Sequence, residues 1–193
     1  MALEIVKEKL DIPVIGVILP GASSAIQKTK TNKIGVIATQ ASIRSDEYHK
    51  TIARKSSAVE VYSLACPKFV SIVESNEMES EIARKVVSES LVPLIGKVDT
   101  LILGCTHYPL LRSLIQETMG KEVRLIDSGA EAVRDISVLL NYFSINGQER
   151  QPLEHRFYTT AGVNSFREIA EKWLNIGQLQ IEHTEIENFN KEK

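Results

Sequence analysis

The stretch DTLILGCTHYPLL at residues 99–111 constrains the fold of this chain more than any other segment. Its first part is a short apolar run, which is typical of a strand buried in a parallel sheet. After a glycine come Cys105, Thr106 and His107. Pro109 then has the fixed φ that suits the first turn of a helix. The stretch therefore predicts a strand, a polar turn and a helix, with a thiol, a hydroxyl and an imidazole in the turn.

The position of Cys105 has a chemical consequence. The unpaired amides and the positive dipole end of the predicted helix favour a thiolate over a thiol. His107, two residues further on, could add a positive charge or carry a proton. Cys105 is therefore a candidate base or nucleophile. The alternative is that it is a small buried hydrophobic residue, as free cysteines often are.

Strand-like and helix-like segments alternate over the first 142 residues. Such alternation is typical of an α/β fold in which helices flank a parallel sheet. Apolar, β-branched runs predict strands at residues 12–19, 33–38, 59–64, 99–103 and 123–126. Helices are predicted at residues 3–10, 22–28, 44–55, 69–74, 79–95 and 110–119, and a last one, capped by Asp127 or Ser128, runs to residue 142.

A polar segment at residues 146–153, with a glycine and a proline, is the best candidate for a linker. Behind it the sequence predicts a strand at residues 157–160, a helix at 165–174 and a strand at 179–186. We therefore expect a shorter strand–helix–strand segment after the main alternation.

Polar residues that could carry chemistry share one position in the chain. Thr39 and Ser42, then Glu74, then the turn at residues 105–107 each follow an apolar segment. Because the carboxyl ends of parallel strands meet at one edge of a sheet, these groups could line one cleft. Thr39 and Ser42 could instead be helix caps, and Glu74 a solvated helix end. Cys66, which precedes a proline, is expected to be a packed thiol rather than a reactive one.

Composition argues against several classes of site. A net charge of −2 over 193 residues is not the basic footprint of a nucleic-acid-binding protein. No apolar run reaches the roughly 18 residues of a membrane span. The two cysteines, Cys66 and Cys105, form no C-x-x-C pair and indicate free thiols in a reducing cytoplasm. With His107 they lack the spacing of a zinc site, and the glycines form no nucleotide-binding pattern.

The segment LILGCTHYPLL at residues 101–111 closely resembles the second cysteine motif of the cofactor-independent glutamate racemases. The GCTHYP match is specific to the aspartate/glutamate racemase group, and the whole sequence is similar to the form found in Gram-positive bacteria. Four further segments resemble the family in the same order: DIPVIGVILPGA (11–22), IGVIATQASIRS (34–45), LACPKFVSIVES (64–75) and LIDSG (125–129).

The resemblance implies a two-base mechanism. One cysteine thiolate takes the α-proton of L- or D-glutamate, and a second cysteine returns a proton on the opposite face, without pyridoxal phosphate, metal or other cofactor. It further implies that Cys105 is one base, that His107 assists Cys105 and also binds the substrate, and that Thr106 binds the substrate. Glu74 matches an acidic residue that the family carries near its active site.

The family fold implies the domain organisation. It is a two-domain, aspartate/glutamate racemase-like α/β fold whose domains face each other over the substrate. Residues 20–126 would form the middle domain, and residues 1–19 and 127–193 an incomplete first domain. Thr39 and Ser42 match the hydroxyl-bearing substrate-binding turn, with Ser42 where threonine is usual. A cytoplasmic enzyme, often a homodimer, that supplies D-glutamate for peptidoglycan and the cell wall is implied as well.

One element of the family has no counterpart in the sequence. The family carries its first catalytic cysteine in an N-terminal motif, and we expect this chain to lack that segment. Cys66 aligns with the family's Ala-Cys-Pro turn and is not expected to replace the missing cysteine. The strands at residues 12–19, 157–160 and 179–186 would then have no partners.

Two alternative functions stay open. The chain could be another amino-acid racemase of the same group, such as an aspartate racemase. It could also be a catalytically inactive fragment that acts only as a binding module, which the unmatched first cysteine favours.

Overall fold

A four-stranded parallel sheet lies at the centre of the computed structural model, which describes residues 2–145, 155–174, 176–177 and 179–185. The chain forms two compact units, residues 1–146 and 147–193, and the sheet belongs to the first. The α/β class with a parallel sheet, which the alternation predicts, is confirmed. The strands lie in the order β2-β1-β3-β4 and are β1 Lys33–Ala38, β2 Glu60–Ala65, β3 Thr100–Leu103 and β4 Arg124–Asp127.

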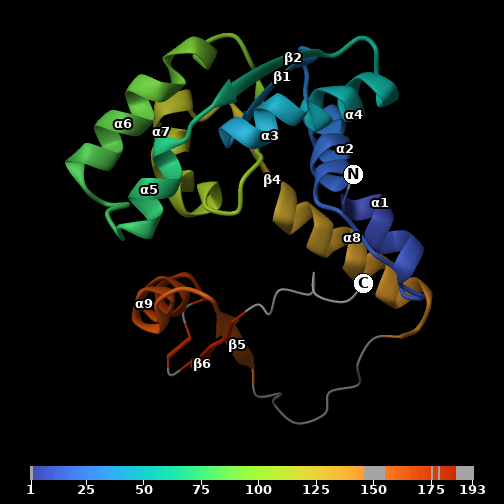
Figure 1. Cartoon of the computed structure of the whole chain (residues 1–193). Coiled ribbons are helices and arrows are strands. Elements are labelled where there is room, and N and C mark those ends of the chain that lie inside the picture. The colour runs from blue at the N-terminus through green and yellow to red at the C-terminus, as the bar shows by residue number, and fades with distance from the viewer. Residues whose placement is uncertain (1, 146–154, 175, 178, 186–193) are drawn as a thin grey trace. The chain divides into compact units, whose positions relative to one another are not determined.

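Helices cover both faces of this sheet (Figure 1). Successive residues of a strand point to opposite faces of the sheet, so the strands contribute side chains to a hydrophobic core on each face. Val36 and Ile102 belong to the core that includes residues of α2 and α4, whereas Ile37 and Leu103 belong to the core that includes residues of α5, α6 and α7. These helices are α2 Ile18–Lys28, α4 Glu47–Lys55, α5 Lys68–Glu74, α6 Glu81–Leu91 and α7 Arg112–Met119.

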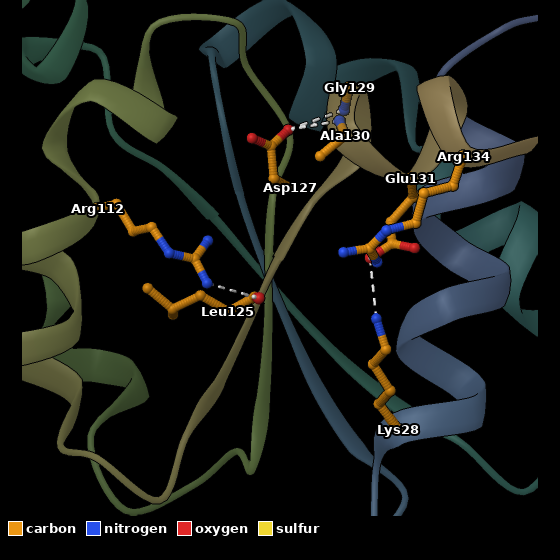
Figure 2. Close-up of polar contacts among 8 residues, drawn as sticks. All are labelled: Lys28, Arg112, Leu125, Asp127, Gly129, Ala130, Glu131 and Arg134. Atoms are coloured by element: carbon orange, nitrogen blue, oxygen red, sulfur yellow. Dashed lines mark hydrogen bonds and ion pairs between the residues drawn. The ribbon is translucent and has the colours of Figure 1, made fainter. Parts of the chain in front are cut away.

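The last helix of the first unit packs against α2. It begins behind Asp127, one of the two predicted caps, whose Oδ1 accepts hydrogen bonds from the amides of Gly129 (2.9 Å) and Ala130 (3.1 Å) (Figure 2). The remaining elements of this unit are α1 Ala2–Lys9, α3 Gln40–Ser45, the 3₁₀ helices η1 Val92–Leu94 and η2 Tyr108–Leu111, and α8 Ser128–Tyr142.

The contact between α2 and α8 includes a partly buried ion pair. Lys28 Nζ lies 2.9 Å from Glu131 Oε1, and Arg134 Nη1 lies 2.7 Å from the same oxygen (Figure 2). Burial alone would raise the pKa of Glu131, but the hydrogen bonds and positive charges of these two partners outweigh it and lower the pKa. Glu131 is therefore ionised and links α8 to α2 through its ion pair with Lys28.

The strand predicted at residues 12–19 is wrong. No strand forms there; α2 begins at Ile18 instead. Pro20 lies in the first turn of that helix, where an amide has no intrahelical acceptor and a proline costs little. Gly21 is needed because a Cβ there would lie 2.3 Å from Ser128 Oγ. The Pro-Gly pair thus lies inside a helix, although it resembles a strand-ending turn.

The predicted helices at residues 44–55 and 79–95 are each divided. The first breaks at Asp46, whose φ of +60° does not belong to a right-handed helix, into α3 and α4. The second ends at Leu91 and continues as η1, which contains Pro93. A proline has no amide to donate, so it ends the α-helical ladder there.

The second unit contains a two-stranded parallel sheet. Its elements are β5 Arg156–Thr159, α9 Val163–Leu174 and β6 Gln180–His183. The expectation that the strands at residues 157–160 and 179–186 lack partners is therefore wrong, because they pair with each other. The predicted linker at residues 146–153 lies outside the described residues, and the predicted domain boundaries stay a prediction.

The amino ends of β1 and β3 are joined by Asp99. Its carboxylate accepts hydrogen bonds from Thr29 Oγ1 (2.6 Å) and from the amides of Lys30 (2.6 Å) and Thr31 (2.7 Å). Its own amide donates to the carbonyl of Lys33 at 3.2 Å. Burial alone would raise the pKa of Asp99, but these hydrogen bonds lower it to about 2.

We predict that Asp99→Asn lowers the free energy of unfolding by about 1–2 kcal/mol at pH 7, since hydrogen bonds to a charged acceptor are lost. A carboxyl group whose pKa is lowered on folding stabilises the protein above its unfolded pKa, and this contribution disappears as the pH falls towards 2. The difference in the free energy of unfolding between the wild-type chain and Asp99→Asn should therefore be about half as large at pH 3 as at pH 7. Urea unfolding at both pH values measures it. Asp135→Asn, which changes an exposed carboxylate on α8, is the control, and equal losses in both variants would contradict the role of Asp99.

Candidate active site

The site residues meet where the strand order of the sheet reverses. From β1 the chain proceeds to β2 on one side, and β3 and β4 are added on the other side. In open parallel sheets this switch point leaves a crevice at the carboxyl ends of the two central strands. Thr39 directly follows β1, and Cys105 follows β3 after one glycine. The amide of Gly104 donates to the carbonyl of Ile37 at 2.8 Å, so the two strand ends stay paired up to the turn.

Gly104 provides space at this point. A Cβ there would lie 3.0 Å from the Tyr48 ring, 3.1 Å from the Ile37 carbonyl and 3.2 Å from the Ala38 Cβ. Contacts this short are rare for a real Cβ, so any larger residue would push the turn outwards. The glycine before Cys105 is therefore required by the close approach of β1 and α4.

Cys105, His107 and Glu74 form a chain of polar contacts. Cys105 Sγ lies 3.7 Å from His107 Nδ1, and His107 Nε2 lies 3.4 Å from Glu74 Oε1. The imidazole thus stands between a thiol and a carboxylate, which is the arrangement in which a third group orients a proton carrier. Glu74 is the last residue of α5, so the structure brings together two of the predicted groups that lie 33 positions apart.

These three groups are open to solvent to different degrees. Cys105 is half-buried, while the side chains of His107 and Glu74 are 31% and 63% exposed. A carboxylate this exposed is well screened, so its contact with His107 is weak and serves mainly to orient the imidazole. The arrangement is suited to proton transfer, in which His107 must change its charge.

The hydroxyl groups at the same edge are placed by local contacts. Thr106 is exposed, with Oγ1 3.4 Å from His107 Nδ1. Thr39 is the N-cap of α3: its Oγ1 accepts from the Ser42 amide at 3.3 Å and lies 3.1 Å from Ser42 Oγ. The capping role considered for Thr39 is therefore present, and the substrate-binding roles of these residues stay predictions.

Cys66 is a packed thiol, as predicted. It is 2% exposed, and burial raises the pKa of its thiol to about 12. Its backbone is fully used: the amide donates to the Ala38 carbonyl at 3.0 Å, and the carbonyl accepts from Tyr108 Oη at 2.8 Å and from the Phe69 amide at 3.1 Å. Cys66 therefore belongs to the buried residues that support the site.

Two buried tyrosines next to the site are not predicted from the sequence. Tyr108 follows His107, and Tyr48 of α4 donates a 2.9 Å hydrogen bond to Ser128 Oγ beneath Gly104. Burial raises the pKa of both phenols, so both remain hydrogen-bond donors at neutral pH. An aromatic residue inside the GCTHYP motif was the available signal for Tyr108, whereas nothing local marks Tyr48.

Other features of the described residues do not extend the site. A hollow of about 940 Å³ lies beside α1, α2, α4 and α8, and one of about 410 Å³ lies at the amino ends of the strands, near Asp99. No group of three or more His, Cys, Asp or Glu side chains in the described part of the chain could hold a metal ion. Among the same residues, no helix has both the length and the apolar character needed to span a membrane.

Comparison with known proteins decides the family. A model described as Asp/Glu/hydantoin racemase matches residues 1–136. The chain belongs to this racemase family. The glutamate racemase of Lactococcus lactis subsp. cremoris (strain MG1363) is 90% identical over all 193 residues, which span 71% of that protein.

Solved structures of family members have the same fold. The crystal structure of a glutamate racemase isoform from Bacillus anthracis matches with a TM-score of 0.88 and 40% identity, over 95% of this chain and 69% of the other. The glutamate racemase of Francisella tularensis, solved in complex with D-glutamate, matches with a TM-score of 0.85 and 34% identity, over 96% and 69% of the two chains. The racemase-like fold predicted from the motifs is confirmed.

We predict that iodoacetamide alkylates Cys105 in the native chain at pH 7.5 at least tenfold faster than Cys66, because thiolate formation and access control the rate. Peptide mass spectrometry distinguishes the two sites. In urea the two rates should converge, which serves as the control. Comparable native rates would contradict the buried, protonated state of Cys66.

Proposed function

We propose that this chain takes part in the interconversion of L- and D-glutamate, with Cys105 as one of the two groups that move the α-proton. The observation that carries the proposal is the contact chain Glu74–His107–Cys105 at the switch point of the sheet. It is supported by 90% identity to a glutamate racemase over the whole chain.

The proposed chemistry follows from the difficulty of the step. The α-proton of an amino acid is a very weak acid, so the base must be close and the developing negative charge must be stabilised. The Cys105 thiolate would remove the proton from one face, and His107 would balance the charge of the thiolate. Glu74 would keep the imidazole oriented. In this proposal no cofactor or metal takes part.

The carboxylates of glutamate need donors, and the site offers several without a basic patch. The hydroxyls of Thr106, Thr39 and Ser42 stand at or beside the strand ends. Backbone amides at such ends bind anions well. We propose that these groups hold the substrate with its α-carbon against Cys105.

Racemisation also needs a group on the opposite face of the α-carbon. Cys66 is unsuited to this role, since its thiol is buried and its pKa is raised to about 12. We therefore propose that the second proton is handled by a group other than Cys66. An inactive chain that only binds ligands remains the alternative from another functional class.

Glutamate is favoured over aspartate as the substrate. The curated relatives at 58–90% identity are glutamate racemases. An aspartate racemase from Picrophilus torridus is only 20% identical with a TM-score of 0.51, which supports a shared fold alone. Turnover of the two amino acids side by side would separate the hypotheses.

We extend the proposal to the setting that the family resemblance implies. D-glutamate made in the cytoplasm would supply peptidoglycan. The exposed apolar side chains of Val138 and Tyr142 lie one turn apart on α8 and would suit an interface between two copies. Sedimentation of a strictly monomeric species at micromolar concentration would argue against a homodimer.

We predict that, in a version extended to the full length of the curated relatives, Cys105→Ala abolishes racemisation and His107→Asn lowers turnover by roughly 10²–10⁴, the range for a positioned acid–base group. The loss in His107→Asn should be larger in one direction, because this residue assists the base on one face. Circular dichroism starting from each enantiomer measures both directions. His49→Asn, an exposed histidine on α4, is the control. Near-normal turnover in Cys105→Ala would show that the proposal is wrong.

A further inference from the structure

Tyr108 connects the two segments that carry the acid–base groups. It directly follows His107, and it is fully buried. Its hydroxyl donates a 2.8 Å hydrogen bond to the carbonyl of Cys66. Its ring packs edge-on against Phe69 of α5, with the ring centroids 5.2 Å apart and the planes at 64°. Tyr108 is therefore held both at its polar tip and along its ring.

The partner of Tyr108 lies at the start of the helix that ends at Glu74. Cys66 closes the turn that leads into α5, and the Phe69 amide donates to the same carbonyl at 3.1 Å. The hydroxyl of Tyr108 thus links the first turn of α5 to the turn that carries His107. The seven residues of α5 then set the distance from this link to the Glu74 carboxylate.

The contact between Glu74 and His107 is too weak to bring its own backbone segments together. Both side chains are partly exposed, and solvent weakens an ion pair between exposed groups. A buried hydrogen bond together with an edge-on aromatic pair contributes more, and it lies one residue from His107. The spacing of the acid–base groups must therefore come from the buried contacts.

We propose that Tyr108 is a positioning residue, whose hydroxyl, through the carbonyl of Cys66, sets the distance between Glu74 and His107 and so aims the imidazole at Cys105. This inference rests on the proposed acid–base role of His107, but it concerns geometry and not turnover. The hydroxyl of Tyr108 is engaged and buried, so it does not touch the reacting atoms itself.

The test is a double-mutant cycle read out by the alkylation rate of Cys105 at pH 7 in the 193-residue chain. Glu74→Gln should slow alkylation about two- to fivefold, the range for one exposed ion pair, because an imidazole that the carboxylate no longer orients supports the thiolate less. Tyr108→Phe, which keeps the ring, should slow it in the same way. The double variant should be no slower than the slower single variant, because Tyr108 acts through Glu74.

Tyr48→Phe is the matched control, because it also removes one buried phenolic hydrogen bond but leaves the link between Cys66 and the 107–108 turn intact. It should change the alkylation rate less than Tyr108→Phe. Urea unfolding confirms that each variant is folded. If Tyr108→Phe does not fold, Phe69→Leu tests the same link from the α5 side and should also slow alkylation without adding to Glu74→Gln.

Three outcomes would overturn the proposal: an unchanged rate in Tyr108→Phe, additive effects in the double variant, or an equal effect in Tyr48→Phe. The cycle does not depend on turnover. If Cys105 proves dispensable for racemisation while the cycle stays non-additive, the proposed function fails and the positioning role stands.

Discussion

The parallel pairing of β1 with β3 is the contact on which the rest of the structure depends. Ile34 pairs with Thr100 and Ile37 with Leu103, and Asp99 joins the amino ends of the same two strands. Because this pairing places the end of β1 beside the end of β3, the Thr39 turn and the Cys105 turn share one edge of the sheet. Helices covering opposite faces then leave these turns in the crevice of the switch point.

A rigid frame carries reactive groups that stay open to solvent. Buried tyrosines and a buried cysteine form the layer beneath the turn, and their polar atoms are paired: Tyr108 with Cys66, and Tyr48 with Ser128. The groups suited to proton transfer lie above this layer and keep some exposure. Such a division is reasonable because buried, paired groups resist a change of charge, whereas a proton carrier must change its charge in each cycle.

Much of the fold could be predicted because local pattern and final structure agree. The strand at residues 33–38 is an apolar, β-branched run between polar segments, and it forms as predicted. The run at residues 12–19 is also apolar and β-branched, but Ile12 is 66% exposed and the chain becomes helical from Ile18. Short apolar runs do not distinguish a strand from an irregular segment leading into a helix, and tertiary contacts decide.

The sequence predicts which edge of the sheet carries the site, but it does not predict which side chains touch there. That Glu74, Cys105 and His107 follow apolar segments was visible in the sequence, and parallel pairing made a common edge a natural inference. The strand order, and with it the switch point, depends on long-range pairing that no local pattern contains. The bond from Tyr108 to Cys66 spans 42 positions and depends on the same pairing.

Cys105 is the proposed reacting group at this edge of the sheet, and protection of its thiol by the substrate is the sharpest test of that role. In a version extended to the full length of the relatives, iodoacetamide inactivation would be followed together with alkylation of Cys105, with and without glutamate. If Cys105 has this role, the loss of activity should equal the fraction of alkylated Cys105, and glutamate should slow both equally, with aspartate less effective. Full activity after complete alkylation of Cys105, or alkylation that saturating glutamate leaves unchanged, would contradict it.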